Sequence, residues 1–165
     1  MGNAESNPVR NLDKRTARRQ YRKTFEKAIM AFRVANDDIA ISEPKPANEG
    51  NGLQVYVRKR PIFPRELEAE FDVITCSPTT VTIHDARMEA DMRHQFLRHH
   101  RFVFDSVFGA AATNAEVYDC AVAPLVECAL LGGHATCFMY GQTGSGKTFT
   151  MSSVHSSLCA VTLSR

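Results

Sequence analysis

Several features are missing from this sequence, and each absence excludes a class of protein. No apolar run approaches the roughly 18 residues that a membrane-spanning helix needs. The five cysteines are odd in number and include no C-x-x-C pair, which argues against a disulfide framework and against a zinc site. The first thirty residues are polar and basic, so no secretory signal peptide is visible. These absences, with 44% apolar and 23% charged residues, predict one soluble domain in a reducing compartment.

Charge is distributed unevenly along the chain. Residues 10–33 hold nine Lys or Arg and two acids, a balance of +7, whereas the whole chain carries +2. The remaining positions hold eleven basic and sixteen acidic residues. The sequence therefore predicts a basic N-terminal arm attached to a mildly acidic domain.

The basic arm has the pattern of a helix within residues 11–41. Apolar residues recur at spacings of 4, 4 and 3, which place them on one helical face: Tyr21, Phe25, Ile29 and Phe32. Basic residues cover much of the remaining surface: Arg15, Arg18, Arg19, Arg22, Lys23 and Lys27. Two interpretations stay open at this point. The helix is either docked by its apolar stripe and otherwise solvated, or it is a basic helix that binds an acidic polymer or surface.

The segments on either side of this helix have no pattern of regular structure. Residues 1–10 are expected to be disordered, and their start, MGNAES, fits the N-myristoylation pattern, which would attach Gly2 to a membrane. Residues 42–52 are rich in Pro, Gly, Asn and Glu and are typical of a linker.

Short strand patterns follow the linker. Leu53 to Arg58 alternates apolar and polar residues as a strand does, and Pro61 then stops further pairing. Two more β candidates, Phe71 to Cys76 and Val81 to His84, are separated by Ser77-Pro78, and Phe102 to Phe104 is another.

The polar stretch between His84 and Phe102 has a different period. Met88, Met92, Phe96 and then His99 recur at helical spacing, which favours a helix. Its histidines, His94, His99 and His100, do not share one helical face at i and i+4, so no metal site is expected.

The next element is predicted to be a capped helix followed by a strand. Thr113 and Glu116 form a capping box, and Gly132-Gly133 supplies the stop. Pro124 predicts a kink or an irregular turn within the helix. Its buried face is expected to hold Val117, Ala121, Leu125 and Cys128. Ala135 to Tyr140 is an apolar and aromatic run with the pattern of a buried strand.

The segment Gly141 to Thr148, GQTGSGKT, has the form of a phosphate-binding loop directly after that predicted strand. Glycines at 141, 144 and 146 let backbone N–H groups approach a polyphosphate closely. The pattern places Lys147 to reach the β- and γ-phosphates, and the hydroxyl of Thr148 to ligate Mg²⁺ at the start of a helix. Strand, capped helix, strand, loop and helix together predict an α/β nucleotide-binding fold.

Taken together, these motifs resemble the first half of a kinesin motor domain. The resemblance rests on RKRP after the first predicted strand, on FVFDSVF (Phe102 to Phe108) and on MYGQTGSGKTFTM (Met139 to Met151). Within the kinesins, VYVRKRP and the run before FVFD are most similar to the internal-motor, microtubule-depolymerising class, whose neck the basic helix and ISEP resemble. The implied fold is a P-loop NTPase mixed sheet flanked by helices, with residues 53–151 as the N-terminal half of the motor, residues 11–41 as a neck-like helix and residues 152–165 as a divergent tail.

The resemblance implies a nucleotide site with ATP and Mg²⁺ as its cofactors. Lys147 and Thr148 would be the catalytic residues and Thr148 the metal ligand. The nucleotide-binding residues would be Arg58, Arg60, Pro61, Gly141, Gln142, Thr143, Gly144, Ser145, Gly146, Lys147, Thr148 and Phe149. Phe149 stands where many kinesins have a histidine, and a phenyl ring can still stack on adenine. The Lys-Val-Asp loop signature of the depolymerising class is Glu89-Ala90-Asp91 in this chain, which weakens the inference to depolymerisation.

The sequence after the loop lacks the motifs that the kinesin family needs for ATP hydrolysis. Residues 149–165 contain no Asp or Glu, and neither N-x-x-S-S-R nor D-x-x-G-x-E occurs in the sequence. We therefore expect an N-terminal fragment of a kinesin-like microtubule motor that binds ATP, with microtubule-based movement or depolymerisation belonging to the complete protein, and we expect the isolated chain to fold poorly.

The resemblance implies microtubules as the partner, no nucleic acid, and a cytoplasmic, microtubule-associated location. The alternative is a non-catalytic truncated protein whose basic helix binds microtubules or an acidic membrane. A different P-loop NTPase is a third possibility.

Overall fold

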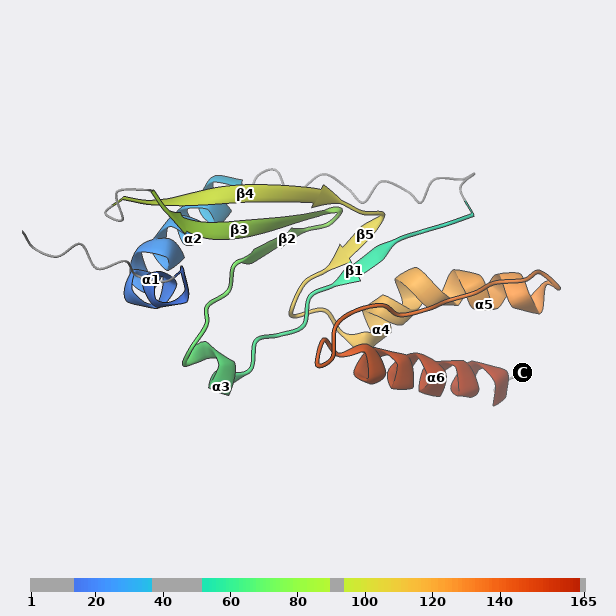
Figure 1. The fold of residues 1–165 in the computed structure, drawn as a ribbon. Coiled ribbons are helices and arrows are strands. Elements are labelled where there is room, and N and C mark those ends of the chain that lie inside the picture. The colour runs from blue at the N-terminus through green and yellow to red at the C-terminus, as the bar shows by residue number, and fades with distance from the viewer. Residues whose placement is uncertain (1–13, 37–51, 90–93, 164–165) are drawn as a thin grey trace, which may run out of the picture. The chain divides into compact units, whose positions relative to one another are not determined.

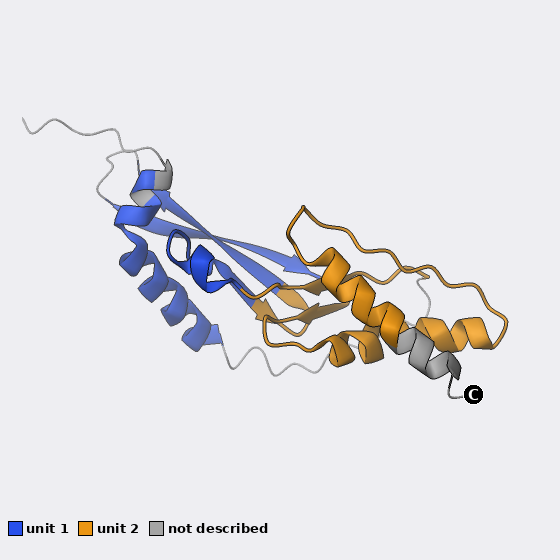
Figure 2. Cartoon of the chain, turned by 90° about the horizontal axis from the view of Figure 1, so that it is seen from below, with its two compact units in different colours: residues 1–42, 62–75, 81–103 blue, residues 43–61, 76–80, 104–165 orange. Residues whose placement is uncertain are grey.

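The computed structural model describes residues 14–36, 52–89 and 94–163. The chain divides into two compact units, coloured blue and orange in Figure 2. The myristoylation pattern at the N-terminus and nearly all of the predicted linker lie outside the described residues. Each unit has a core of its own, and the two are described separately.

The first unit comprises the described parts of residues 1–42, 62–75 and 81–103. Its basic arm folds as two consecutive helices, α1 (Lys14–Gln20) and α2 (Arg22–Asn36). The break falls at Tyr21, whose carbonyl accepts the N–H groups of both Thr24 and Phe25. The predicted apolar stripe is confirmed, since Phe25 and Ile29 are 2% and 1% exposed.

This apolar stripe packs against a three-stranded sheet. Its order is β2 (Ile74–Ser77), β3 (Thr80–Met88) and β4 (Gln95–Val103), and α2 lies along one face in Figure 1. The core is formed by Phe25, Ile29, Phe71 and Ala86, with Tyr21, Val73 and Leu97 packed around it. The docked-helix interpretation is therefore correct for the apolar face. A short helix, α3 (Pro64–Leu67), precedes the sheet, and the carboxylate of Glu66 accepts the N–H of Phe63 at 2.9 Å.

The predicted helix between His84 and Phe102 is wrong, because β3 and β4 occupy most of this stretch. In β3, Thr82, His84 and Ala86 are buried at alternate positions, which is the period of a strand. The spacing of four shared by Met88, Met92 and Phe96 is also a multiple of two, so it fits a strand as well as a helix.

The second unit comprises the described parts of residues 43–61, 76–80 and 104–165. Strand β1 (Tyr56–Arg58) pairs in parallel with β5 (Ser106–Phe108), with Tyr56 opposite Ser106. The pairing extends at both ends: the carboxylate of Asp105 accepts the N–H of Val55 at 2.7 Å, and the N–H of Lys59 donates to Phe108 O at 2.8 Å. Of the strand predicted at Leu53 to Arg58, the C-terminal half, Tyr56–Arg58, is a strand in the structure.

The capped helix of the second unit is present and irregular, as Pro124 predicts. It consists of α4 (Asn114–Val117), a π-helical turn (Tyr118–Val122) and α5 (Ala123–Leu130). The wider turn moves the buried face, so Tyr118 and Val122 pack against Val154 of helix α6 (Lys147–Leu163). Of the face predicted at Val117, Ala121, Leu125 and Cys128, Val117 is buried and Cys128 is exposed.

The buried strand predicted at Ala135 to Tyr140 is wrong. This segment has no regular structure, and Phe138 and Tyr140 are 76% and 96% exposed. A strand needs a hydrogen-bonded neighbour, and among the described residues no backbone hydrogen bond joins this segment to another one. Its apolar sequence alone therefore does not make it a strand.

The capping box at the start of α4 is confirmed. The carboxylate of Glu116 accepts the backbone N–H of Thr113 at 2.6 Å and its hydroxyl at 2.9 Å, and the N–H of Glu116 donates back to the Thr113 hydroxyl at 3.2 Å. The backbone hydrogen bond, followed by the side-chain one, holds the pKa of Glu116 below its ordinary value.

Replacement of Thr113 tests this cap. We expect Thr113→Ala to lower the free energy of unfolding of the second unit by about 1 kcal/mol, because the side-chain acceptor at the N-cap is lost. Thr113→Ser keeps the hydroxyl and should retain most of the stability. Urea unfolding followed by circular dichroism measures both variants, and equal losses in Ala and Ser would show that the hydroxyl does not cap the helix.

The same cap should depend on pH. The pKa of Glu116 is lowered by folding, so its contribution is complete above the ordinary carboxyl pKa of about 4.3 and is lost as pH falls through the lower folded value. The difference between wild type and Thr113→Ala should therefore shrink in acid.

Candidate nucleotide-binding site

The phosphate loop lies in the second unit, directly before α6. Gly144 and Gly146 have φ angles of 81° and 95°, in the left-handed region that a residue with a Cβ rarely adopts. A Cβ on Gly141 would lie 2.6 Å from Ser145 Oγ, so the Ser145 side chain would have to turn away, and the φ angle of 155° at this position also favours glycine. The backbone conformation thus favours glycine at positions 141, 144 and 146.

Lys147 is the first residue of α6, and its side chain folds back over the loop. Its Nζ donates to Gly141 O and to Gln142 O, both at 2.8 Å. A positive charge at a helix N-terminus is unfavourable against the helix dipole, and the two carbonyl oxygens offset that cost. The ammonium and the free N–H groups of the first turn of α6 together form a site suited to an anion.

Arg58, at the end of β1, ties three segments of the second unit together. Its guanidinium donates to Ala112 O at 3.1 Å, to Thr150 Oγ1 at 2.9 Å and to Asn114 Oδ1. The Thr150 hydroxyl in turn donates to Gly146 O at 3.3 Å, which connects Arg58 to the loop. Arg58 therefore positions α6 against the start of α4.

The side of the loop near Arg58 also carries an aromatic ring. The guanidinium carbon of Arg58 lies 5.6 Å from the centre of the Phe149 ring, within the range of a cation–π contact. Phe149 is 65% exposed, so part of the ring faces solvent. An aromatic ring held on one side by a cation is a suitable surface for a planar base.

The remaining residues predicted to bind the nucleotide lie in the loop, at the start of α6 or directly after β1. Arg60 and Gly146 are half-buried, and the following are exposed: Pro61, Gln142, Thr143, Gly144, Ser145 and Thr148. The loop residues fit the phosphates of a nucleotide, because positive φ angles, a lysine and a helix N-terminus converge there. The Thr148 hydroxyl, predicted as the Mg²⁺ ligand, belongs to an exposed residue in the first turn of α6.

Two residues of the site were missed by sequence reasoning, Asn114 and Thr150. Asn114 follows the cap residue Thr113, and Thr150 lies in the FTM segment, so both belong to recognised motifs. Nothing in the sequence indicates that Arg58 contacts them, since they are separated from it by 56 and 92 positions.

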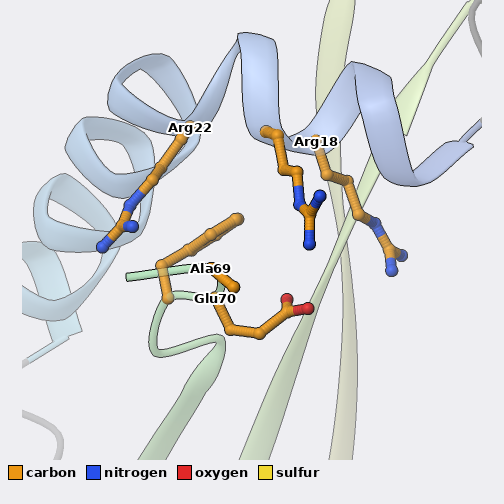
Figure 3. Close-up of a pocket in the computed structure, with 6 residues that line it drawn as sticks. Arg18, Arg22, Ala69 and Glu70 are labelled. Atoms are coloured by element: carbon orange, nitrogen blue, oxygen red, sulfur yellow. The ribbon is translucent and has the colours of Figure 1, made fainter. Parts of the chain in front are cut away.

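The first unit contains a pocket lined by arginines, shown in Figure 3. Its lining residues are Arg18, Arg19, Arg22, Ala69, Glu70 and Phe71. Arg18 pairs with Asp85 at 2.6 Å, and Arg22 pairs with Glu26 at 2.8 Å and donates to Leu67 O at 2.7 Å. These two arginines are engaged in holding the helices to their own unit, so the pocket does not present three available positive charges.

The described residues lack two further kinds of feature. No helix among them has the length and apolar character needed to cross a membrane. No cluster of three or more His, Cys, Asp or Glu side chains in this part of the chain has the arrangement of a metal site.

Comparison with known proteins tests the resemblance inferred from the motifs. Residues 58–162 match the family model of the kinesin motor domain. Human kinesin-like protein KIF24 is 43% identical over 112 residues, which cover 67% of this chain and 8% of that protein. The mouse kinesin-like protein KIF24 is 42% identical over 117 residues, covering 70% of this chain and 9% of that protein.

The chain thus spans less than a tenth of the length of the curated relatives it matches. The match runs from Arg58, at the end of β1, through the phosphate loop and nearly to the end of α6. It confirms the predicted α/β, kinesin-like fold class. The chain belongs to the kinesin motor-domain family.

Proposed function

We propose that this chain binds ATP with Mg²⁺ through Gly141 to Thr148 and forms the nucleotide-binding part of a microtubule-directed motor ATPase. The observation that carries the proposal is the closed loop, in which the Lys147 ammonium bridges two loop carbonyls at the N-terminus of a 17-residue helix. Family membership supports a nucleotide as the anion.

Each residue of the loop has a separate role in this proposal. The Lys147 ammonium exchanges its bonds to Gly141 O and Gln142 O for oxygens of the β- and γ-phosphates. The backbone N–H groups of Gly144 and Gly146 bind phosphate oxygens, and the dipole of α6 stabilises their charge. The Thr148 hydroxyl would hold Mg²⁺, which would supply positive charge next to the phosphates.

The base side of the site is formed by Phe149 and the segment after β1. Arg58 holds the ring from one side, so its exposed surface is available to stack on adenine. Arg60 and Pro61 line the base in the manner that the kinesin resemblance implies. Arg58 itself acts as a positioning residue, because three of its five N–H donors are already used by Ala112, Asn114 and Thr150.

Turnover and action on microtubules are proposed for the longer protein. The residues after the loop carry no carboxylate to complete the Mg²⁺ site or to orient water. In that protein, residues 11–41 would form a neck and residues 53–151 the first half of the motor. Movement along microtubules and their depolymerisation are both consistent with this role, in the cytoplasm at the microtubule cytoskeleton.

Lys147→Ala tests the nucleotide site directly. We expect it to weaken binding of a fluorescent ATP analogue, with Mg²⁺ present, by roughly 10- to 100-fold, because a hydrogen bond to a charged group contributes about 1.5–3 kcal/mol. Lys23→Ala is the matched control: Lys23 is exposed on α2, its loss changes the net charge equally, and binding should not change. Equal weakening in both variants, or no binding by the parent chain, would refute the proposal.

A second function is favoured by the exposed basic face of the first unit. Arg19, Lys23 and Lys27 are exposed while the apolar stripe of the same helices is buried, which leaves these charges available to the acidic surface of a microtubule. In that case the chain would be a binding module whose activity does not need ATP.

Cosedimentation with microtubules distinguishes this module from the ATPase. Binding through the basic face should fall with rising ionic strength and be lost in Arg19→Glu/Lys23→Glu/Lys27→Glu, while Lys147→Ala binds like the parent. Binding that resists salt, or that Lys147→Ala abolishes, would contradict the module. Binding to acidic vesicles but not to microtubules would assign the same face to a membrane.

A further inference from the structure

Two histidines of the first unit are in direct contact, and neither belongs to the nucleotide site. His84 lies on β3 and His99 on β4, with their Nδ1 atoms 2.7 Å apart. The N–H of Glu89 donates to His94 O at 2.9 Å, and the same antiparallel register places His84 opposite His99. His84 is 1% exposed, whereas His99 is exposed on one side.

Helix α2 packs directly on this pair. The ring of Phe32 stacks on His99, with centroids 4.4 Å apart and an angle of 23°, and meets His84 edge-on at 4.8 Å and 70°. The two imidazoles also contact each other edge-on, at 4.9 Å. Three rings therefore form part of the contact between the C-terminal half of α2 and the sheet.

A polar chain continues from the histidine pair to α2. His84 Nε2 lies 2.8 Å from Thr75 Oγ1 on β2, and the guanidinium of Arg33 donates to that same oxygen at 3.1 Å. Arg33 also binds the Asp72 carboxylate at 3.0 Å and Ile74 O at 3.0 Å. Arg33 and Asp72 are thus the charged groups hydrogen-bonded next to the pair.

Other charged groups lie on the two strands themselves. Arg98, His100 and Arg101 flank His99 along β4. On β3, Asp85 follows His84 and is engaged with Arg18 at 2.6 Å and Arg87 at 2.7 Å. Most of these groups are basic.

The contact between the two Nδ1 atoms limits how many protons the pair can hold. A hydrogen bond at 2.7 Å needs a proton on one nitrogen and a lone pair on the other. Two neutral rings satisfy this, and so does one neutral ring with one charged ring. Two charged rings cannot, since both Nδ1 atoms would then carry hydrogens directed at each other, beside the guanidinium of Arg33.

We propose that the His84–His99 pair is a proton-sensitive latch that holds α2 on the sheet. Released histidines can take up two protons, whereas the latched pair takes up at most one. By linkage, the latched state loses stability as pH falls wherever the released state binds more protons. An ordinary imidazole changes charge near about pH 6.5, so release should begin below neutral pH. The latch does not depend on the proposed nucleotide site.

Amide hydrogen exchange of the full chain tests the latch. After correction for the intrinsic rate, protection of α2 should fall by up to about tenfold per pH unit below neutrality, while Asn114–Leu130 in the same sample serves as reference. His99→Gln keeps a hydrogen-bond acceptor for His84 but removes one titrating ring, and should abolish this fall. His100→Gln, the neighbouring position on β4, is the matched control and should keep it.

Three results would overturn the latch: α2 protection that does not change with pH in the parent chain, an unchanged fall in His99→Gln, or a fall that His100→Gln abolishes. If His99→Gln does not fold, imidazole NMR of the parent chain decides instead. The second proton should then enter the pair in the same pH interval in which α2 loses protection. A doubly charged pair beneath a protected α2 would refute the proposal.

Discussion

The guanidinium of Arg58 determines how the phosphate-loop unit is assembled. It donates to a carbonyl before α4, to the side chain of Asn114 within α4 and to Thr150 in the first turn of α6. These segments are far apart in the sequence, and the apolar cluster of Tyr118, Val122 and Val154 also joins the capped helix to α6. A planar group with several donors in fixed directions can satisfy all three acceptors, which a lysine cannot do. The position of the loop therefore depends on this half-buried charge together with that apolar cluster.

The first unit uses its arginines in a similar way. Arg18, Arg22 and Arg33 each pair with a carboxylate and also donate to a backbone carbonyl. The basic arm, which in the sequence is typical of a surface that binds acidic partners, is thus partly a structural device that attaches α1 and α2 to their sheet. What remains for a partner is the exposed side that holds Arg19, Lys23 and Lys27.

Features set by neighbouring residues could be predicted from the sequence, and those that depend on distant ones could not. The glycines of the loop, the Thr113 cap and the stop at Gly132 each act within a few positions, and all were predicted. The contacts of Arg58 with Asn114 and Thr150 join residues 56 and 92 positions apart and leave no local pattern. The same is true of His84 and His99, whose stretch was predicted to be a helix. The prediction for Ala135 to Tyr140 was wrong because a local pattern was present without the distant partner that a strand needs. Its residues have the pattern of a strand, but no described segment pairs with it.

The central claim is that a nucleotide binds where the loop, Phe149 and the segment after β1 meet. The most direct measurement is the change of backbone amide chemical shifts in the full chain when Mg²⁺ and ATP are added. The account predicts changes at Arg58 to Arg60 and at Gly141 to Thr150, with α1 and α2 unaffected. Changes confined to the basic helices, or none at saturating nucleotide, would contradict it.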